Sequence, residues 1–349
     1  MIENYEHNFD EMANSPITFF LFLKKTCAPY RNVAIYNITL AFTGEIDMKD
    51  VIKFISEIKI TEVGKIKIKN KCLVKLLPIP VLQKCISMSS VSDVTHISCV
   101  KSDLLWISDR GSLILTNTDG QRLRHIPDIV EGMWDKGKHT VNVYGDLFYI
   151  NRECNIIQLS ANNRTKSTLM KRESETPVCV FCSTSNEDLL VGFYLGKVHR
   201  YDKTGQQIHT IEHNDKGHRM YSEPMYITEN CNGDVILSDR DNGVVVTDSV
   251  GRYRFSYTGS PLGPQILPYG ICTDASSNII VCDYFNEIVQ IIDKNGTFTR
   301  LLLTEQEVRG KPYSLCYDHE KDLIYVGFWR SNDILVYGCR EGHDYLTEN

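Results

Sequence analysis

The chain has 349 residues, of which 42% are hydrophobic and 23% charged, a composition typical of a globular protein. Its net charge of −6 is unevenly spread, because residues 1–84 carry 12 Lys/Arg against 9 Asp/Glu while the remainder carries 26 against 35. An acidic remainder argues against a surface built mainly to neutralise phosphates, although it leaves room for a local basic patch.

Residues 1–80 are expected to form a separate N-terminal helical and linker segment. The apolar run Ile17–Leu23 is too short to span a bilayer, and it follows acidic residues, unlike a signal peptide. We therefore expect a cytoplasmic protein without membrane contact, whose 12 cysteines stay reduced and fill the core. Helices are predicted over residues 10–25 and 47–59, and a coiled-coil remnant in residues 1–25 is one interpretation that would allow an oligomer. The alternating stretch Lys65–Lys71 predicts an edge strand or an extended linker, with solvated lysines favoured over a nucleic-acid or membrane contact.

Residues 81–338 contain an internal repeat. Pro224, Pro268 and Pro312 each open a similar stretch at a spacing of 44 residues. In the unit from Pro224, four short apolar strands are expected at Met225–Thr228, Val235–Leu237, Val244–Thr247 and Tyr253–Tyr257. Weaker units begin at His96, His139 and Pro177, which makes six units of about forty residues, the period of a four-stranded propeller blade. The sequence therefore predicts an all-β, six-bladed β-propeller followed by a C-terminal tail at 339–349.

Closure of the ring supports the same count. The last unit ends after its third strand, Ile334–Tyr337, which leaves its sheet without an outer strand. An unassigned strand, Val81–Met88, precedes the first unit. We expect this N-terminal strand to complete the last blade and to remove an open sheet edge.

In a four-stranded up-and-down blade, the strand order determines on which of the two faces of the propeller each loop lies. The loops between second and third strands and those that join blades share one face, called here the upper face; the remaining turns lie on the lower face. Arginines and large aromatic side chains gather in the upper loops, and these residue types dominate binding hot spots. The predicted partner-binding residues are Arg110, Arg152, Tyr194, Arg240, Tyr284, Phe285, Trp329 and Arg330.

Some repeated residues are better explained by structure. Tyr226, Tyr269 and Tyr313 follow the blade prolines, and packing between blades is the favoured interpretation over ligand contact. Asp239 and Asp283 recur at one blade position, which favours a structural hydrogen bond to the next turn.

The sequence predicts no catalytic residue, no metal site and no cofactor. Cys179 and Cys182 form a lone Cys-x-x-Cys pair on an expected strand, so core packing is favoured over zinc. A metal-dependent propeller enzyme remains an alternative, for which the candidate ligands are Glu229, Asp274 and Asp318. The repeat puts these three carboxylates toward the lower rim.

The repeat resembles a known family. Pro268-Tyr-Gly-Ile271, the strand Ile279–Asp283 and the stretch Val289–Gly296 resemble the NHL repeat, and the units from Pro224 and Pro312 match less completely. The whole chain is similar to the C-terminal part of divergent, bivalve-type tripartite-motif (TRIM–NHL) proteins. That resemblance implies a substrate receptor in ubiquitin transfer, and some family propellers bind RNA instead. The sequence lacks the RING and B-box Cys/His arrays that precede the propeller in those relatives.

The leading hypothesis is a non-catalytic propeller that recognises a protein substrate or peptide, with any ubiquitin ligase activity supplied by another chain. The alternative is an RNA-binding propeller. A contiguous positive patch built from Arg110, Arg152, Arg240 and Arg330 would favour RNA, and exposed aromatic side chains on a mixed surface would favour protein.

Overall fold

The computed structural model describes residues 80–89, 91–101, 103–129, 137–162, 165–259, 264–304 and 307–338, and the short strands β1 (Lys59–Ile60) and β2 (Ile66–Lys67). The chain divides into two compact units, Met1–Leu77 and Pro78–Asn349. Within the described part of the chain there is no helix that could cross a membrane.

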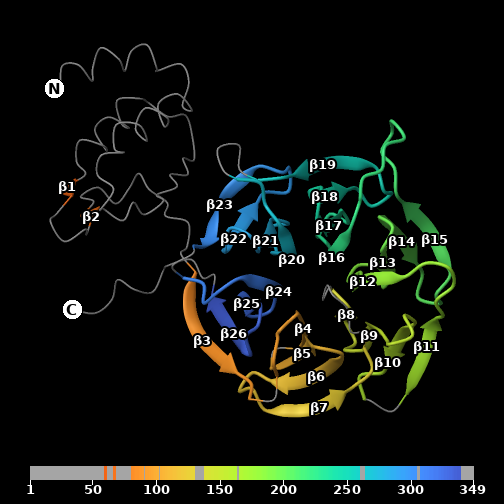
Figure 1. Ribbon diagram of the computed structural model, residues 1–349, viewed down its shortest axis with the longest axis horizontal. Coiled ribbons are helices and arrows are strands. Elements are labelled where there is room, and N and C mark those ends of the chain that lie inside the picture. The colour runs from red at the N-terminus through yellow and green to blue at the C-terminus, as the bar shows by residue number, and fades with distance from the viewer. Residues whose placement is uncertain are drawn as a thin grey trace. The chain divides into compact units, whose positions relative to one another are not determined.

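The second unit is an all-β propeller of six four-stranded antiparallel sheets arranged in a ring (Figure 1). Blade 1 contains β4 (His96–Lys101), β5 (Leu104–Asp109), β6 (Ser112–Asn117) and β7 (Arg122–Ile126), and blade 2 contains β8 (His139–Val141), β9 (Leu147–Ile150), β10 (Ile156–Leu159) and β11 (Lys166–Met170). Blade 3 contains β12 (Pro177–Cys182), β13 (Leu189–Phe193), β14 (Lys197–Tyr201) and β15 (Gln207–Ile211), and blade 4 contains β16 (Pro224–Glu229), β17 (Val235–Asp239), β18 (Gly243–Thr247) and β19 (Tyr253–Tyr257). Blade 5 contains β20 (Pro268–Thr273), β21 (Ile279–Asp283), β22 (Ile288–Ile292) and β23 (Phe298–Leu303), and blade 6 contains β24 (Pro312–Asp318), β25 (Leu323–Phe328), β26 (Asp333–Gly338) and β3 (Val81–Ser87).

The predicted fold class is confirmed, including the number of blades and the strand order of blade 4. Two expectations concern residues before the propeller. The helix predicted over 10–25 lies outside the described residues. Of the helix predicted over 47–59, only the last residue is described. That residue, Lys59, begins β1 and pairs with Lys67 of β2, so the helix prediction is wrong at its end.

The middle strands of each blade are buried on both faces because neighbouring blades pack against them. All five residues of β17 and of β21 are buried, which explains why these strands are continuous apolar runs and not alternating ones. The outer strand β15 is exposed at four of its five positions. Gly270 of β20 permits one close approach near the axis, since a Cβ there would lie 2.7 Å from the backbone of Ser314 and Leu315 in β24.

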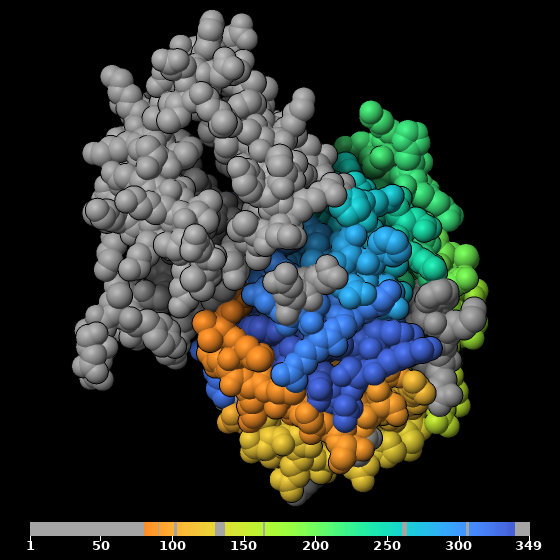
Figure 2. Space-filling model, turned by 60° about the vertical axis from the view of Figure 1, so that its left-hand side comes forward, coloured from red at the N-terminus to blue at the C-terminus, as the bar shows by residue number. Residues whose placement is uncertain are grey.

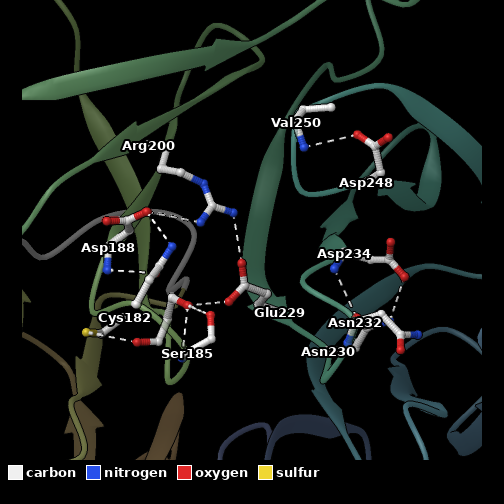
Figure 3. Close-up of polar contacts among 12 residues, drawn as sticks. Cys182, Ser185, Asp188, Arg200, Glu229, Asn230, Asn232, Asp234, Asp248 and Val250 are labelled. Atoms are coloured by element: carbon white, nitrogen blue, oxygen red, sulfur yellow. Dashed lines mark hydrogen bonds and ion pairs between the residues drawn. The ribbon is translucent and has the colours of Figure 1, made fainter.

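The lower turns share one hydrogen-bonding device. Asn230 Oδ1 accepts the backbone N–H groups of Asn232 and Asp234, and Asp248 Oδ1 accepts that of Val250 (Figure 3). Asp248 Oδ1 also accepts the N–H group of Arg252. An Asn or Asp that binds its own backbone two and four residues onward stabilises a tight turn. The same pattern recurs at Asn117, Asn142, Asp202, Asp274 and Asp293.

The N-terminal strand completes blade 6, as predicted. β3 pairs antiparallel with β26 from Ser87–Asp333 to Val81–Gly338, and the Ser87 hydroxyl donates to the Asp333 carboxylate at 2.5 Å. In Figure 2 the orange N-terminal residues lie directly against the blue C-terminal ones. β3 also reaches blade 1, where Lys84 forms an ion pair with Asp119 at 2.7 Å. The strand therefore connects the first and last blades.

We predict that Ile86→Ala destabilises the propeller by ~2–4 kcal/mol in urea unfolding, because Ile86 is 1% exposed and its loss leaves a cavity at the closing strand. Lys84→Ala, on the exposed side of the same strand, should cost less than ~1 kcal/mol. Equal effects of the two substitutions would contradict the closing role of β3.

Candidate functional site

The upper loops of blades 3 to 6 are held together by a repeated backbone hydrogen bond. The first residue after the second strand donates its N–H to the carbonyl of the residue before the first strand. The pairs are Tyr194–Thr176, Arg240–Glu223, Tyr284–Leu267 and Trp329–Lys311, at 2.9–3.1 Å. Four of the predicted binding residues therefore hold equivalent positions in successive blades.

Buried carboxylates strengthen this link. Asp239 Oδ2 accepts the N–H groups of Ser222 and Glu223, and its Oδ1 accepts the N–H of Asn242. Asp283 holds its own upper loops in the same way. Burial raises the pKa of both carboxyl groups, against the opposing effect of the bonds they accept. The structural interpretation of these repeated aspartates is confirmed.

Four aromatic rings meet on the upper face over blades 5 and 6, and we call them the aromatic cluster: Tyr269, Tyr284, Tyr313 and Trp329. Ring centroids lie 4.9 Å apart for Tyr269–Tyr284, 4.5 Å for Tyr269–Tyr313 and 5.0 Å for Tyr313–Trp329. Tyr269 and Tyr313 are buried beneath the partly exposed Tyr284 and Trp329. The cluster is therefore a packed base with two rings at its surface.

Cations and a further ring border the aromatic cluster. Lys311 Nζ lies 4.7 Å from the centroid of Tyr284, and Arg330 Cζ lies 5.9 Å from that of Trp329. Phe285, next to Tyr284 on the same loop, is 69% exposed. Arg330 has a left-handed φ of 54°, a conformation that glycine adopts without strain. Within the described residues neither Lys311 nor Arg330 has a carboxylate partner.

Of the other predicted binding residues, Arg240 lies close enough to Tyr269 of the aromatic cluster to interact with it electrostatically, and the remaining three belong to blades 1, 2 and 3. Arg240 forms an ion pair with Glu223 at 3.4 Å, and Arg110 forms one with the buried Asp93. Arg152 belongs to the β9–β10 loop of blade 2, and Tyr194 belongs to the β13–β14 loop of blade 3, where it is exposed. The structure thus brings together Tyr284, Phe285, Trp329 and Arg330 of the eight.

Tyr226 closes the central channel on the upper side. Its hydroxyl donates across the axis to the carbonyl of Thr95 at 2.5 Å, which joins blade 4 to the opposite blade 1. Its ring contacts His96 of blade 1 and Tyr313 of blade 6, at 5.4 and 6.5 Å between centroids. The side chain is 2% exposed. Packing between blades is therefore confirmed for Tyr226, and it extends across the axis.

Below Tyr226 the channel widens into a cavity of about 480 Å³, lined by the first strands of all six blades. At its closed end His139 Nε2 lies 3.2 Å from the carbonyl of Trp106, so this nitrogen carries the proton. His139 Nδ1 then accepts from the Ser108 hydroxyl at 2.8 Å, and His96 Nδ1 lies 3.2 Å away as a second donor. Both imidazoles are held neutral by this arrangement.

The three carboxylates considered as metal ligands already accept hydrogen bonds from protein groups at the lower rim. Glu229 accepts from Arg200 at 2.8 Å and from Ser183, while Arg200 also pairs with Asp188 at 3.3 Å (Figure 3). Asp274 and Asp318 each accept backbone N–H groups of their own turns. Among the described residues no three His, Cys, Asp or Glu side chains gather to hold a metal ion.

Cys179 and Cys182 of β12 are both buried, as core packing requires. Burial raises the pKa of the Cys182 thiol to about 12, which makes it unreactive at neutral pH.

One residue that shapes this region, Lys311, was missed in the sequence, and the contact that Tyr226 makes across the axis was not foreseen. Lys311 directly precedes a blade proline, and its place over Tyr284 depends on the neighbouring blade. Tyr226 occupies the position of Gly270 and Ser314 in the next units, so only its bulk distinguishes it. A tyrosine at a position otherwise held by small residues was the available signal.

No protein-family model matches the chain, and no curated protein sequence matches it. Solved structures similar to it include a gluconolactonase-like protein, at 14% identity over 75% of this chain and 94% of the other, with a TM-score of 0.56. Virginiamycin B lyase from Staphylococcus aureus matches at 14% identity over 74% and 99%, with a TM-score of 0.53. A WD40 β-propeller domain matches at 13% identity over 75% and 97%, with a TM-score of 0.52. At such identities the likeness shows the β-propeller fold alone.

Acid should destabilise the protein through the channel histidines. Burial lowers the pKa of His139 from 6.5 to about 3, and that of His96 well below its usual value. Between pH 6.5 and about 3, His139 is protonated in the unfolded chain but stays neutral in the folded protein. The free energy of unfolding therefore falls by ~1.4 kcal/mol for each unit by which the pH is lowered.

We predict that His139→Gln removes about that much slope from urea unfolding measured between pH 6.5 and 4.5. His209→Gln, at an exposed position of β15, is the matched control for the substitution itself. An unaltered slope in His139→Gln would show that this histidine titrates normally in the folded state.

Proposed function

We propose that the propeller is a non-catalytic protein-recognition module, and that the aromatic cluster with Phe285, Lys311 and Arg330 is its binding surface. The observation that carries the proposal is that Lys311 and Arg330 lie against the partly exposed rings of the cluster. Within the described residues neither cation has a carboxylate partner. Rings held by packing beneath them lose little entropy on binding. The surface suits a peptide segment that places an apolar side chain beside a carboxylate.

Charge favours protein over RNA as the partner. Arg240 and Arg110 are paired with Glu223 and Asp93, so they contribute little net positive potential to the upper face. An RNA-binding surface would combine several unpaired cations into a continuous track. Among the upper-loop cations, Lys311 and Arg330 border the aromatic cluster, while the exposed Arg152 lies in blade 2.

The resemblance to TRIM–NHL proteins adds a role in ubiquitin transfer to the proposal. In this role the propeller selects the substrate, and a RING-containing chain supplies ubiquitin transfer. The test is reconstituted ubiquitination of a partner recovered as described below. Transfer should require both a RING-containing chain and the intact upper face.

The recognition surface is tested with Phe285→Ala combined with Arg330→Gly. Both side chains are outside the packed base, and glycine keeps the left-handed backbone at position 330 without strain. Proteins recovered by quantitative affinity capture on the wild type should be lost from this variant. Direct titration of a recovered partner should show at least ~30-fold weaker binding, as expected when anchor residues worth about 2 kcal/mol are lost.

The matched control is Tyr144→Ala combined with Tyr253→Ala, which removes exposed aromatic side chains from a lower loop and an outer strand. It should retain every partner. Equal recovery on wild type and the upper-face variant would overturn the assignment. Recovery that disappears after nuclease treatment and falls steeply with salt would replace it with RNA binding.

A further inference from the structure

Two thiols from the first and last blades meet on the channel wall. Cys99 lies on β4 of blade 1 and Cys316 on β24 of blade 6, 217 residues apart in sequence. Their Sγ atoms are 2.9 Å apart, and the Cys99 backbone nitrogen lies 3.2 Å from the Cys316 sulfur. A disulfide needs about 2.05 Å between the sulfurs, so the two atoms are within about 1 Å of bonding distance.

We propose that Cys99 and Cys316 are a thiol oxidation site, at which a peroxide converts the pair into a disulfide between blades 1 and 6. Both side chains are partly exposed and line the 480 Å³ cavity, which a small peroxide can enter.

The chemistry proceeds in two balanced steps. The Cys316 sulfur, which accepts the Cys99 N–H, attacks hydrogen peroxide to give a sulfenic acid and one water. The Cys99 thiol then attacks that sulfur, forms the S–S bond and releases a second water. The two thiols lose two electrons and two protons, and the peroxide is reduced to water.

Protonation keeps the pair reduced under mild conditions. The hydrogen bond with Cys316, followed by burial, holds the pKa of Cys99 well above its usual value. Since the thiolate is the reactive form, oxidation should be slow at neutral pH and faster as the pH rises.

The location gives the disulfide a structural consequence. Blade 6 is closed by β3, which is joined by a short segment to β4 of blade 1. Without a disulfide, detachment of β3 from β26 would leave blades 1 and 6 joined by packing and by a few polar contacts, such as the Lys321–Asp103 ion pair at 2.8 Å. A Cys99–Cys316 bond would connect these blades directly and constrain a loop of 217 residues in the unfolded chain.

The experiment uses the full chain, treated with hydrogen peroxide at pH 7 and pH 9 or kept in reductant. Remaining thiols are alkylated, and digestion without reduction is followed by mass spectrometry. We expect a cross-linked peptide pair containing Cys99 and Cys316 that accumulates faster at pH 9. The melting temperature should rise by at least ~5 °C on oxidation, because long disulfide loops are strongly stabilising.

Matched variants separate this pair from the other cysteines. Cys99→Ser and Cys316→Ser should each abolish the oxidation-dependent rise in melting temperature, whatever their effect on the reduced protein. Cys231→Ser removes an exposed thiol that lines the same cavity and should keep the full rise. A peptide joining either cysteine to Cys272, sulfinic acids without a cross-link, or an equal rise in Cys99→Ser would overturn the proposal.

Discussion

The pairing of β3 with β26 is the interaction on which the rest of the propeller depends. Every other blade is built from consecutive hairpins, but blade 6 takes its outer strand from residues that precede blade 1. This exchange pairs the outer side of β26, gives blade 6 its fourth strand, and joins the two ends of the ring through main-chain hydrogen bonds. Blades 6 and 1 are also joined outside β3, by the Lys321–Asp103 ion pair and by the Ser314 hydroxyl that donates to the Val94 carbonyl.

Ring closure produces two different ends of the channel. On the upper side Tyr226 crosses the axis to Thr95, and the aromatic cluster packs beside it over blades 5 and 6. On the lower side the channel widens into the cavity that holds the thiol pair and the neutral histidines. The protein-binding surface and the oxidation site that we propose are therefore separated by a packed tyrosine. A change in one need not alter the other.

Buried polar groups in this propeller serve mainly to hold loops. Asp239 and Asp283 bind backbone N–H groups of the upper loops, and Glu229 neutralises Arg200 between blades 3 and 4. Burial without such partners would cost several kcal/mol for each charge. These carboxylates already accept hydrogen bonds from protein groups. The groups on the upper face that can contact a partner are therefore aromatic rings and cations.

Local patterns predicted much of this architecture. The blade period, the strands of blade 4 and the completing role of Val81–Met88 followed from repeated prolines, apolar runs and an unassigned strand. The grouping of upper-loop residues was predicted only in part, since Tyr284 and Trp329 meet while Arg110 and Arg240 are held by Asp93 and Glu223. Ion pairing depends on side chains from a second loop, which the repeat does not specify.

The sequence by itself determined the number of blades, the approximate positions of the blade 4 strands and the role of the N-terminal strand in the last blade. Those features depend on interactions within a few residues and on one regular period. Only the tertiary structure decided that Tyr226 closes the channel, that Lys311 covers Tyr284 and that Cys99 meets Cys316. Such contacts join residues from different blades, and their distances are set by how six sheets pack around one axis.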